Sequence, residues 1–186
     1  MTGSAEQIDS PEQVNSPERM SSPERIKSRC LNSRLIPMQQ KPLLLPVSCI
    51  ADVVDYSRPS GGSETSPWLL GEIDWRGQAL PLISFERING GRFAEFSATA
   101  RIAVMHSITG NEQLPFYGMV IQGIPQALDL TAGELQPAIE ANNTKGSAET
   151  SRVIIRGIPA AIPDLEKVEQ QLSAIITDRP RDTASH

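Results

Sequence analysis

Residues 67–85 constrain the fold more than any other stretch of the chain. Their sequence, PWLLGEIDWRGQALPLISF, places two apolar runs around a polar tip that ends in glycine, a pattern typical of a β-hairpin. The tip, from Asp74 to Gly77, fits a type I turn with Asp in the first position and Gly in the fourth. We expect Gly77 in the left-handed region as a bulge, with Trp75 and Arg76 at the outer corners. A Trp beside an Arg at such a tip is typical of a protein contact.

Length and charge limit the classes of function that the chain can have. Its 186 residues predict one domain or a compact pair of subdomains. The net charge of −5, with no Lys/Arg cluster in the body, disfavours nucleic acid and anionic membranes as partners. No apolar run approaches membrane-spanning length and no signal pattern begins the chain, so we expect a soluble, cytoplasmic protein without membrane insertion. Cys30 and Cys49 fit no disulfide or metal pattern and are expected to be free thiols.

Residues 1–33 are predicted to be a disordered tail. A six-residue repeat begins at Ser10, Ser16 and Ser22, each time with Ser-Pro-Glu. Ser-Pro-Glu is a helix-start pattern, but each new proline breaks the helix begun before it. One apolar residue per repeat cannot form a core. A flexible extension is the simplest interpretation, and a partner-binding or phosphorylated segment is the alternative. Residues 178–186 are likewise expected to be disordered.

The folded part is predicted to span residues 34–177 and to be all-β, a barrel or a sandwich, because short apolar runs alternate with turn signals. A loop is expected at 56–66 and a linker at 93–100. Near the end, Leu165, Val168, Leu172 and Ile175 recur at helical spacing and predict a helix that starts after Pro163-Asp164. Apart from the central hairpin, the expected strands cover residues 35–38, 41–46, 101–106 and 116–121.

Residues suited to catalysis are sparse. The histidines are His106, at the end of an apolar run, and His186, the last residue. His106 has no Asp, Glu or Cys at ligand spacing, so strand-end packing is the simpler interpretation. Phosphate-binding glycine loops and nucleophile motifs are missing as well. We therefore predict no enzyme activity, no catalytic residue, no metal and no cofactor. A small-barrel nucleic-acid binder is disfavoured by the charge and by the 4% aromatic content.

The central hairpin carries a resemblance to a known family. The pattern Gly-x-x-x-x-Arg-Gly-x-x-x-Pro-Leu-Ile, from Gly71 to Ile83, resembles the signature of the CheW-like coupling proteins. Asp74 stands where the family usually has Asn, and Ser84 where it has Asp. Trp before Arg-Gly, and Leu-Ile-Ser-Phe-Glu after it, are closer to the CheW-like proteins of type IV pilus chemosensory systems. Further matches cover residues 122–130, 134–138 and 152–158, so the resemblance extends from about Leu43 to Leu165.

This resemblance implies two five-stranded SH3-like barrels packed side by side, with a C-terminal helix. It implies a non-enzymatic adaptor that couples the helical tip of methyl-accepting chemoreceptors to the regulatory domain of a CheA-type histidine kinase. A generic interaction module outside chemotaxis is the alternative. The final strand departs from the family, because only residues 160–163 remain and Pro163 interrupts them, so the second barrel is expected to be incomplete or closed differently. The partner-binding residues carried over are Arg76, Trp75, Asp74, Ile50 and Gly77.

Two of these residues keep a second interpretation. Arg76 either supports the receptor contact, with Ile50 nearby, or forms an ion pair with an acid such as Asp52 that braces the hairpin. Trp75 is either a contact anchor or a lid over the first barrel. Gly71 and Gly77 are expected to serve the backbone conformation.

Overall fold

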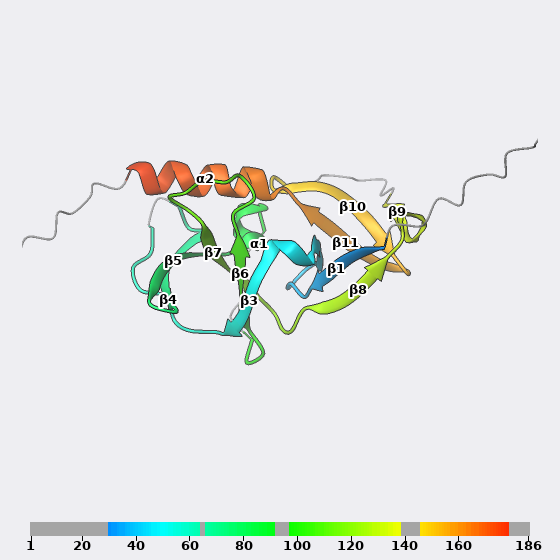
Figure 1. The fold of residues 1–186 in the computed structure, drawn as a ribbon, viewed down its shortest axis with the longest axis horizontal. Coiled ribbons are helices and arrows are strands. Elements are labelled where there is room, and N and C mark those ends of the chain that lie inside the picture. Colours follow the sequence, from blue (N-terminus) through cyan, green and yellow to red (C-terminus); the bar gives the residue numbers. More distant parts are fainter. Residues whose placement is uncertain (1–29, 64–65, 92–96, 139–145, 179–186) are drawn as a thin grey trace, which may run out of the picture.

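The computed structural model describes residues 30–63, 66–91, 97–138 and 146–178, and Figure 1 shows them as two sheets with a long helix across one side. The Ser-Pro-Glu repeat and residues 179–186 lie outside the described residues. Strand β1 begins at Leu31, so the last three residues assigned to the tail belong to the fold. In the described part, neither helix is long and apolar enough to cross a membrane.

The first barrel is a five-stranded sheet in the order β3-β6-β7-β5-β4. Neighbouring strands are antiparallel except β5 and β7, which pair in parallel at Leu82 with Gly118 and Ile83 with Met119. Its interior holds six buried apolar side chains: Ile73, Leu80, Leu82, Ile102, Val104 and Val120. The strands are β3 (Ile50–Asp55), β4 (Leu69–Trp75), β5 (Gln78–Ile83), β6 (Arg101–His106) and β7 (Phe116–Ile121).

The second barrel is a six-stranded sheet in the order β8-β1-β2-β11-β10-β9, one strand more than expected. It has its own core of Leu35, Leu44, Leu130, Val153, Ile155 and Ala160. The predicted two-barrel, all-β architecture is therefore confirmed. The strands are β1 (Leu31–Ile36), β2 (Leu43–Pro46), β8 (Gln126–Leu130), β9 (Leu135–Pro137), β10 (Glu149–Ile155) and β11 (Ile158–Pro163).

Strand β11 corrects the prediction that the second barrel is incomplete. It runs over six residues and pairs with β10 through six register pairs, from Ile158 with Ile155 to Pro163 with Glu149. On its other side it meets β2 in parallel only at Ala161, opposite Leu43. Prolines are tolerated where a strand lacks a continuous ladder or ends. Pro159 and Pro163 stand near the two ends of β11, which is why they do not prevent the strand.

Helix α2 (Leu165–Asp178) packs across both barrels. Its buried residues Leu165, Val168 and Leu172 belong to one cluster with Leu43 of the second barrel and Tyr117 of the first. In Figure 1 the helix lies along one side of the molecule. The helix predicted from the spacing of its apolar residues is confirmed, and Ile175 packs against the same cluster. Three shorter elements complete the fold: η1 (Val47–Cys49), α1 (Phe85–Ile88) and η2 (Ala132–Glu134).

The outer edge of β4 is covered by the loop that precedes it. Ser60 and Glu72 exchange two backbone hydrogen bonds, of 2.9 and 2.8 Å. The crossing is so close that a Cβ on Gly71 would lie 1.8 Å from the carbonyl oxygen of Gly61. Gly71 also has a φ of +133°, a value that side chains disfavour. The backbone role expected for Gly71 is therefore explained by this crossing.

Candidate functional site

The tip of the central hairpin differs from the predicted type I turn. Trp75 pairs with Gln78, so Arg76 and Gly77 alone form the turn, with φ values of 54° and 78°. Two positive φ values in a two-residue loop define a type I′ turn, whose twist matches that of the flanking strands. Trp75 is consequently the last residue of β4 rather than a corner. Asp74 supports the turn, because its Oδ1 accepts a hydrogen bond from Gly77 N at 3.4 Å.

Asp52 joins the hairpin tip to strand β3. Its Oδ2 accepts hydrogen bonds from Trp75 Nε1 at 3.2 Å and from Arg76 Nη2 at 2.9 Å. The Trp75 N–H lowers the pKa of Asp52 most, with further lowering by the Val53 N–H and by Arg76. Strands β3 and β4 are the two edges of the first sheet, so these contacts close the barrel across its seam. The ion pair expected as one interpretation of Arg76 is present.

The ion pair leaves Arg76 accessible. Its side chain is 71% exposed and that of Asp52 is 29% exposed, and exposed pairs contribute only about 0–1 kcal/mol to stability. The guanidinium carbon also lies 4.8 Å from the centroid of the Trp75 ring, within the range of a cation–π contact. Arg76 is therefore held in one orientation by two weak contacts while most of its surface remains open to solvent.

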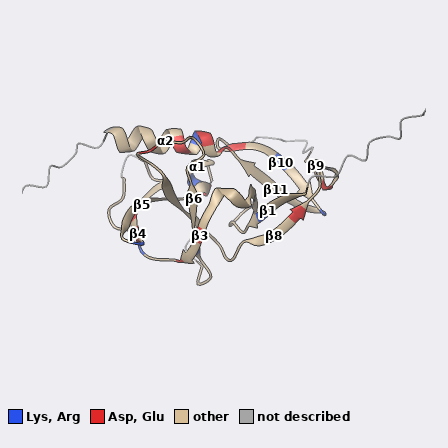
Figure 2. Cartoon of the chain, in the orientation of Figure 1, with Lys and Arg blue, Asp and Glu red and all other residues tan. Residues whose placement is uncertain are grey.

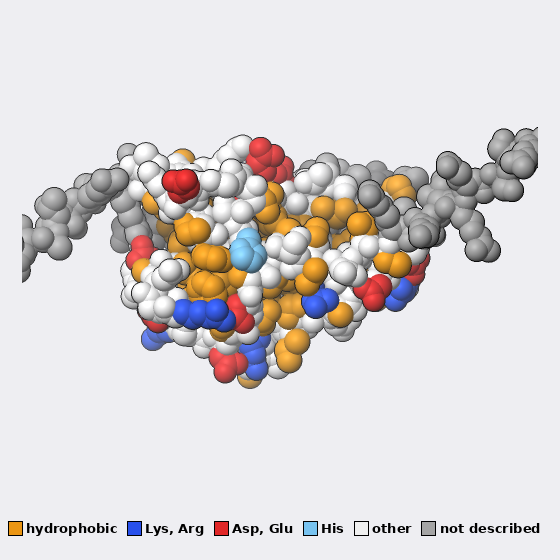
Figure 3. Space-filling view, viewed as in Figure 1, with side chains coloured by type: hydrophobic (Ala, Val, Ile, Leu, Met, Phe, Trp, Pro, Cys, Tyr) orange, Lys and Arg blue, Asp and Glu red, His pale blue; other side chains and the backbone are white. Residues whose placement is uncertain are grey.

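Three rings extend from Arg76 across the barrel, and we call Arg76, Trp75, Phe116 and His106 the aromatic row. The centroids of Trp75 and Phe116 are 5.0 Å apart with a 55° tilt. Those of Phe116 and His106 are 5.2 Å apart with a 45° tilt. Trp75 and Phe116 are half-buried and His106 is exposed. Figure 3 shows His106, in pale blue, among hydrophobic side chains on this face.

Four of the five predicted site residues, Asp74 to Gly77, lie at the hairpin tip, and the fifth, Ile50, lies on β3 two residues before Asp52. Ile50 begins β3, is half-buried, and pairs with Met105, the neighbour of His106. Trp75 packs against the core of the first barrel, as expected of a lid, and remains half-exposed. Phe116 was not predicted as a site residue, and His106 was predicted only to pack at a strand end. The strands expected at 101–106 and 116–121 could have indicated this contact, because His106 and Phe116 are the last pair when these two strands form a hairpin.

The second barrel also has an arginine at a hairpin tip that bonds to groups near its seam. Arg156 and Gly157 form the tip between β10 and β11, with φ values of 49° and 84°. Arg156 Nε donates to Glu134 Oε1 at 2.9 Å, and Arg156 Nη2 to the Asp129 carbonyl at 3.2 Å. These groups flank the seam between the edge strands β8 and β9. The Thr131 N–H and the Arg156 side chain lower the pKa of Glu134 to about 2.

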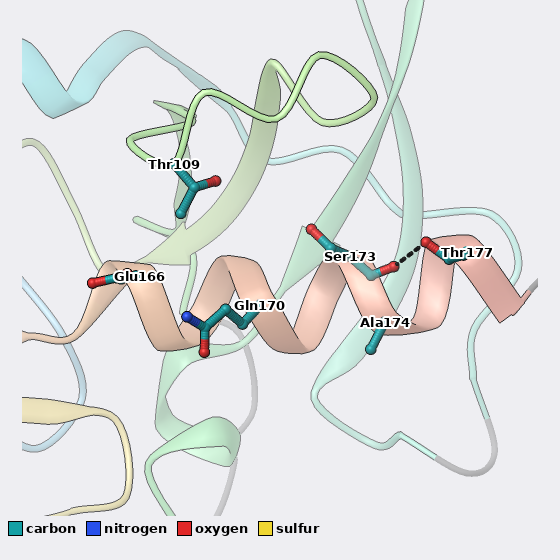
Figure 4. A pocket seen from close by; sticks show the side chains of 6 residues that line it. All are labelled: Thr109, Glu166, Gln170, Ser173, Ala174 and Thr177. Atoms are coloured by element: carbon teal, nitrogen blue, oxygen red, sulfur yellow. Dashed lines mark hydrogen bonds between the residues drawn. The ribbon is translucent and has the colours of Figure 1, made fainter.

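The hollow beside helix α2 has one carboxylate and no His, Cys or Lys among the described residues that line it. This open hollow of about 800 Å³ lies on α2 and is lined by Thr109, Glu166, Gln170, Ser173, Ala174 and Thr177. Figure 4 shows five of these side chains spread along the helix and Thr109 on the loop that faces it, with Thr177 Oγ1 donating to the Ser173 carbonyl at 2.8 Å. In the described ranges, no three His, Cys, Asp or Glu side chains are grouped closely enough to hold a metal ion. Lys, Arg, Asp and Glu are scattered over the chain in Figure 2.

The fold and the site thus define a protein of two small barrels with an exposed aromatic and arginine surface. The model of the CheW-like domain matches residues 35–172, so the chain belongs to the CheW-like domain family. The structure is similar to that of the scaffolding protein TtCheW from Thermoanaerobacter tengcongensis, with a TM-score of 0.59 and 15% identity over 72% of this chain and 88% of that one. At this identity the similarity shows a shared fold. The comparison with curated proteins gave no significant match.

Proposed function

We propose that the protein is a non-enzymatic cytoplasmic adaptor that couples chemoreceptors to a CheA-type histidine kinase. The observation that carries this proposal is the aromatic row, whose ends Arg76 and His106 are exposed and whose inner rings Trp75 and Phe116 are half-buried, on the first barrel of a CheW-like domain. An aromatic and arginine surface of this composition is typical of protein-contact hot spots. The kinase's regulatory domain would bind one end of the first barrel, and the helical tip of a methyl-accepting chemoreceptor would contact Arg76.

The two interpretations of Arg76 are compatible in this arrangement. Asp52 and the Trp75 ring hold the guanidinium in place before a partner arrives. A side chain that is already ordered loses less conformational entropy on binding. Ile50 and Trp75 would supply apolar contact area, while Asp74 and Gly77 keep the turn in the conformation that presents Arg76. The same five residues therefore act as the partner-binding site.

A general interaction module outside chemotaxis is the second candidate. It would use the same surface, since the aromatic row itself does not specify a partner. Nucleic acid is a poor partner for either candidate, because the net charge is −5 and the basic residues are dispersed. We propose a role in chemotaxis because the chain matches the CheW-like family. We propose control of type IV pili as the output because the Trp75-Arg76-Gly77 tip and the Leu-Ile-Ser-Phe-Glu run at 82–86 resemble the CheW-like proteins of pilus systems.

Co-sedimentation with chemoreceptor membranes and the CheA-type kinase of the same organism tests the proposal. Wild-type protein should sediment with receptor and kinase together, and Arg76→Ala should weaken this by about 5- to 150-fold, which corresponds to 1–3 kcal/mol. Asp55→Ala, on the same barrel but outside the aromatic row, is the matched control. Wild-type protein that binds neither partner would refute coupling. Deletion in cells should abolish twitching and leave swimming intact if pili are the output.

A further inference from the structure

The loop between β6 and β7, residues 107–115, is fastened to helix α2 by one buried carboxylate. Glu169 is 0% exposed. Its oxygens accept hydrogen bonds from the backbone N–H groups of Ile108 and Thr109, each at 2.9 Å. They also accept from Ser107 Oγ at 2.9 Å and from Thr109 Oγ1 at 2.7 Å. One turn further along the helix, Ser173 Oγ accepts from Asn111 Nδ2 at 2.9 Å.

Closing the hairpin does not require this carboxylate. Strands β6 and β7 already pair over six residues, up to His106 with Phe116. The Ser107 N–H then donates to the Pro115 carbonyl at 3.0 Å. A buried charge is costly unless hydrogen bonds replace its water, and here two backbone and two hydroxyl donors do so. Glu169 therefore fixes the conformation of the loop rather than the pairing of the strands.

The fixed loop exposes an apolar side chain two residues along the chain from His106, the last member of the aromatic row. Ile108 lies two residues beyond His106 and is 53% exposed, one of the large hydrophobic side chains in the described residues that remain outside the core. Its own N–H is bonded to Glu169. Hydrophobic side chains gather around His106 on this face (Figure 3). The loop thus adds an apolar contact at the end of the row opposite Arg76.

We propose that Glu169 is a positioning residue that holds Ile108 in place as part of the docking surface for the receptor's apolar helical face. This inference rests on the proposed function and deepens it: helix α2, which carries Glu169, would set the shape of a surface built mainly from the first barrel. The partner surface that fits is a helix with an apolar stripe, because Ile108, Phe116 and Trp75 supply apolar area and Arg76 supplies charge at one end.

The test combines amide exchange with binding of a purified cytoplasmic chemoreceptor fragment from the same organism. Glu169→Gln keeps the shape of the side chain but turns one acceptor into a donor that faces backbone N–H groups. Exchange of the Ile108 and Thr109 amides should accelerate at least 100-fold, and affinity should fall at least tenfold. Glu166→Gln, the same change at an exposed site on the same helix, should alter neither quantity by more than twofold.

A double-mutant cycle separates positioning from general destabilisation. Ile108→Ser removes an exposed side chain, so it should leave thermal unfolding unchanged and lower affinity about tenfold. If Glu169 acts through Ile108, the double variant should bind no more weakly than the weaker single variant. If the two tenfold losses of affinity multiply to about 100-fold in the double variant, the proposal is overturned. It is also overturned if Glu169→Gln binds within twofold of wild type although its Ile108 and Thr109 amides exchange fast.

Two further outcomes are informative. If Glu169→Gln does not fold, Thr109→Val replaces it, because that change removes one hydroxyl donor and keeps the carboxylate. The expected result is then the same loss of binding and of amide protection, with thermal unfolding little changed, and retained binding would overturn the proposal. Wild-type protein that fails to bind the receptor fragment would refute the proposed function and this inference together, whereas failure of the Glu169 variants alone to weaken binding refutes only the inference.

Discussion

Removal of the Asp52 carboxylate is the most direct test of the seam in the first barrel. The Asp52→Ala change deletes the acceptor shared by the Trp75 indole and the Arg76 guanidinium. The exposed ion pair accounts for about 0–1 kcal/mol. The partly solvated indole hydrogen bond accounts for about 0.5–1.5 kcal/mol. We therefore expect the free energy of unfolding to fall by about 0.5–2.5 kcal/mol, measured by urea unfolding with circular dichroism at pH 7.

The loss should depend on pH with a definite sign. The pKa of Asp52 in the folded protein lies below its ordinary value, mainly because of the Trp75 N–H. Such a group contributes stability that is fully present above the unfolded pKa, about 4, and is lost as the pH falls through the folded pKa. The difference between wild type and Asp52→Ala should consequently shrink as the pH falls below about 4.

Asp55→Ala is the matched control on the same strand. Asp55 pairs with Arg101 at 3.1 Å, but its side chain is 91% exposed, so this change should cost less than about 0.5 kcal/mol. If Asp52→Ala costs no more than Asp55→Ala, the Asp52 contacts do not hold the seam closed. If Asp52→Ala lowers the free energy of unfolding equally at pH 3 and pH 7, the Asp52 side chain contributes to stability but its charge does not.

Four further changes test the hairpin tips and the covered edge. Gly77→Val places a β-branched residue at a φ of 78° and should lower the free energy of unfolding by about 1–3 kcal/mol in urea unfolding. Arg76→Ala should lower it by less than about 1 kcal/mol. If the two losses are equal, Arg76 serves only as a structural brace. Gly71→Ala brings a Cβ to 1.8 Å from the Gly61 carbonyl and should lower stability by more than about 2 kcal/mol or prevent folding. Glu134→Gln should be less stable than wild type at pH 6, and the difference should shrink as the pH falls from about 4.5 through the folded pKa of about 2, because the contribution of Glu134 is lost over this range.

Features set by local patterns were predictable from the sequence. The strands at 101–106 and 116–121 and the buried face of α2 follow from runs and spacings of apolar residues alone. The turn type was not predictable in this way, because a one-residue shift in pairing separates a bulged type I turn from the type I′ turn of Arg76 and Gly77. Trp75 pairs with Gln78 only because β4 and β5 fix that register.

Features set by contacts between distant segments were missed. Pro163 argued against a strand, yet β11 forms because it pairs with β10 at six positions along one side. The aromatic row depends on a ring from β7 that stacks between one from β4 and one from β6. The fastening of residues 107–109 by Glu169 spans about sixty positions in the chain. A single sequence gives no direct signal for such contacts.

The loop that crosses β4 at Gly71 has a consequence for how the protein behaves among other chains. An open strand edge offers unpaired backbone groups to any passing strand and promotes aggregation. The backbone N–H and C=O of Glu72 on that edge are already hydrogen-bonded to Ser60, so they are not available to pair with a strand of a neighbouring molecule. Recognition on this side must then depend on surface side chains. Surface side chains can be exchanged one at a time without disturbing either barrel, which leaves the scaffold free to acquire new partners through substitution while its backbone stays the same.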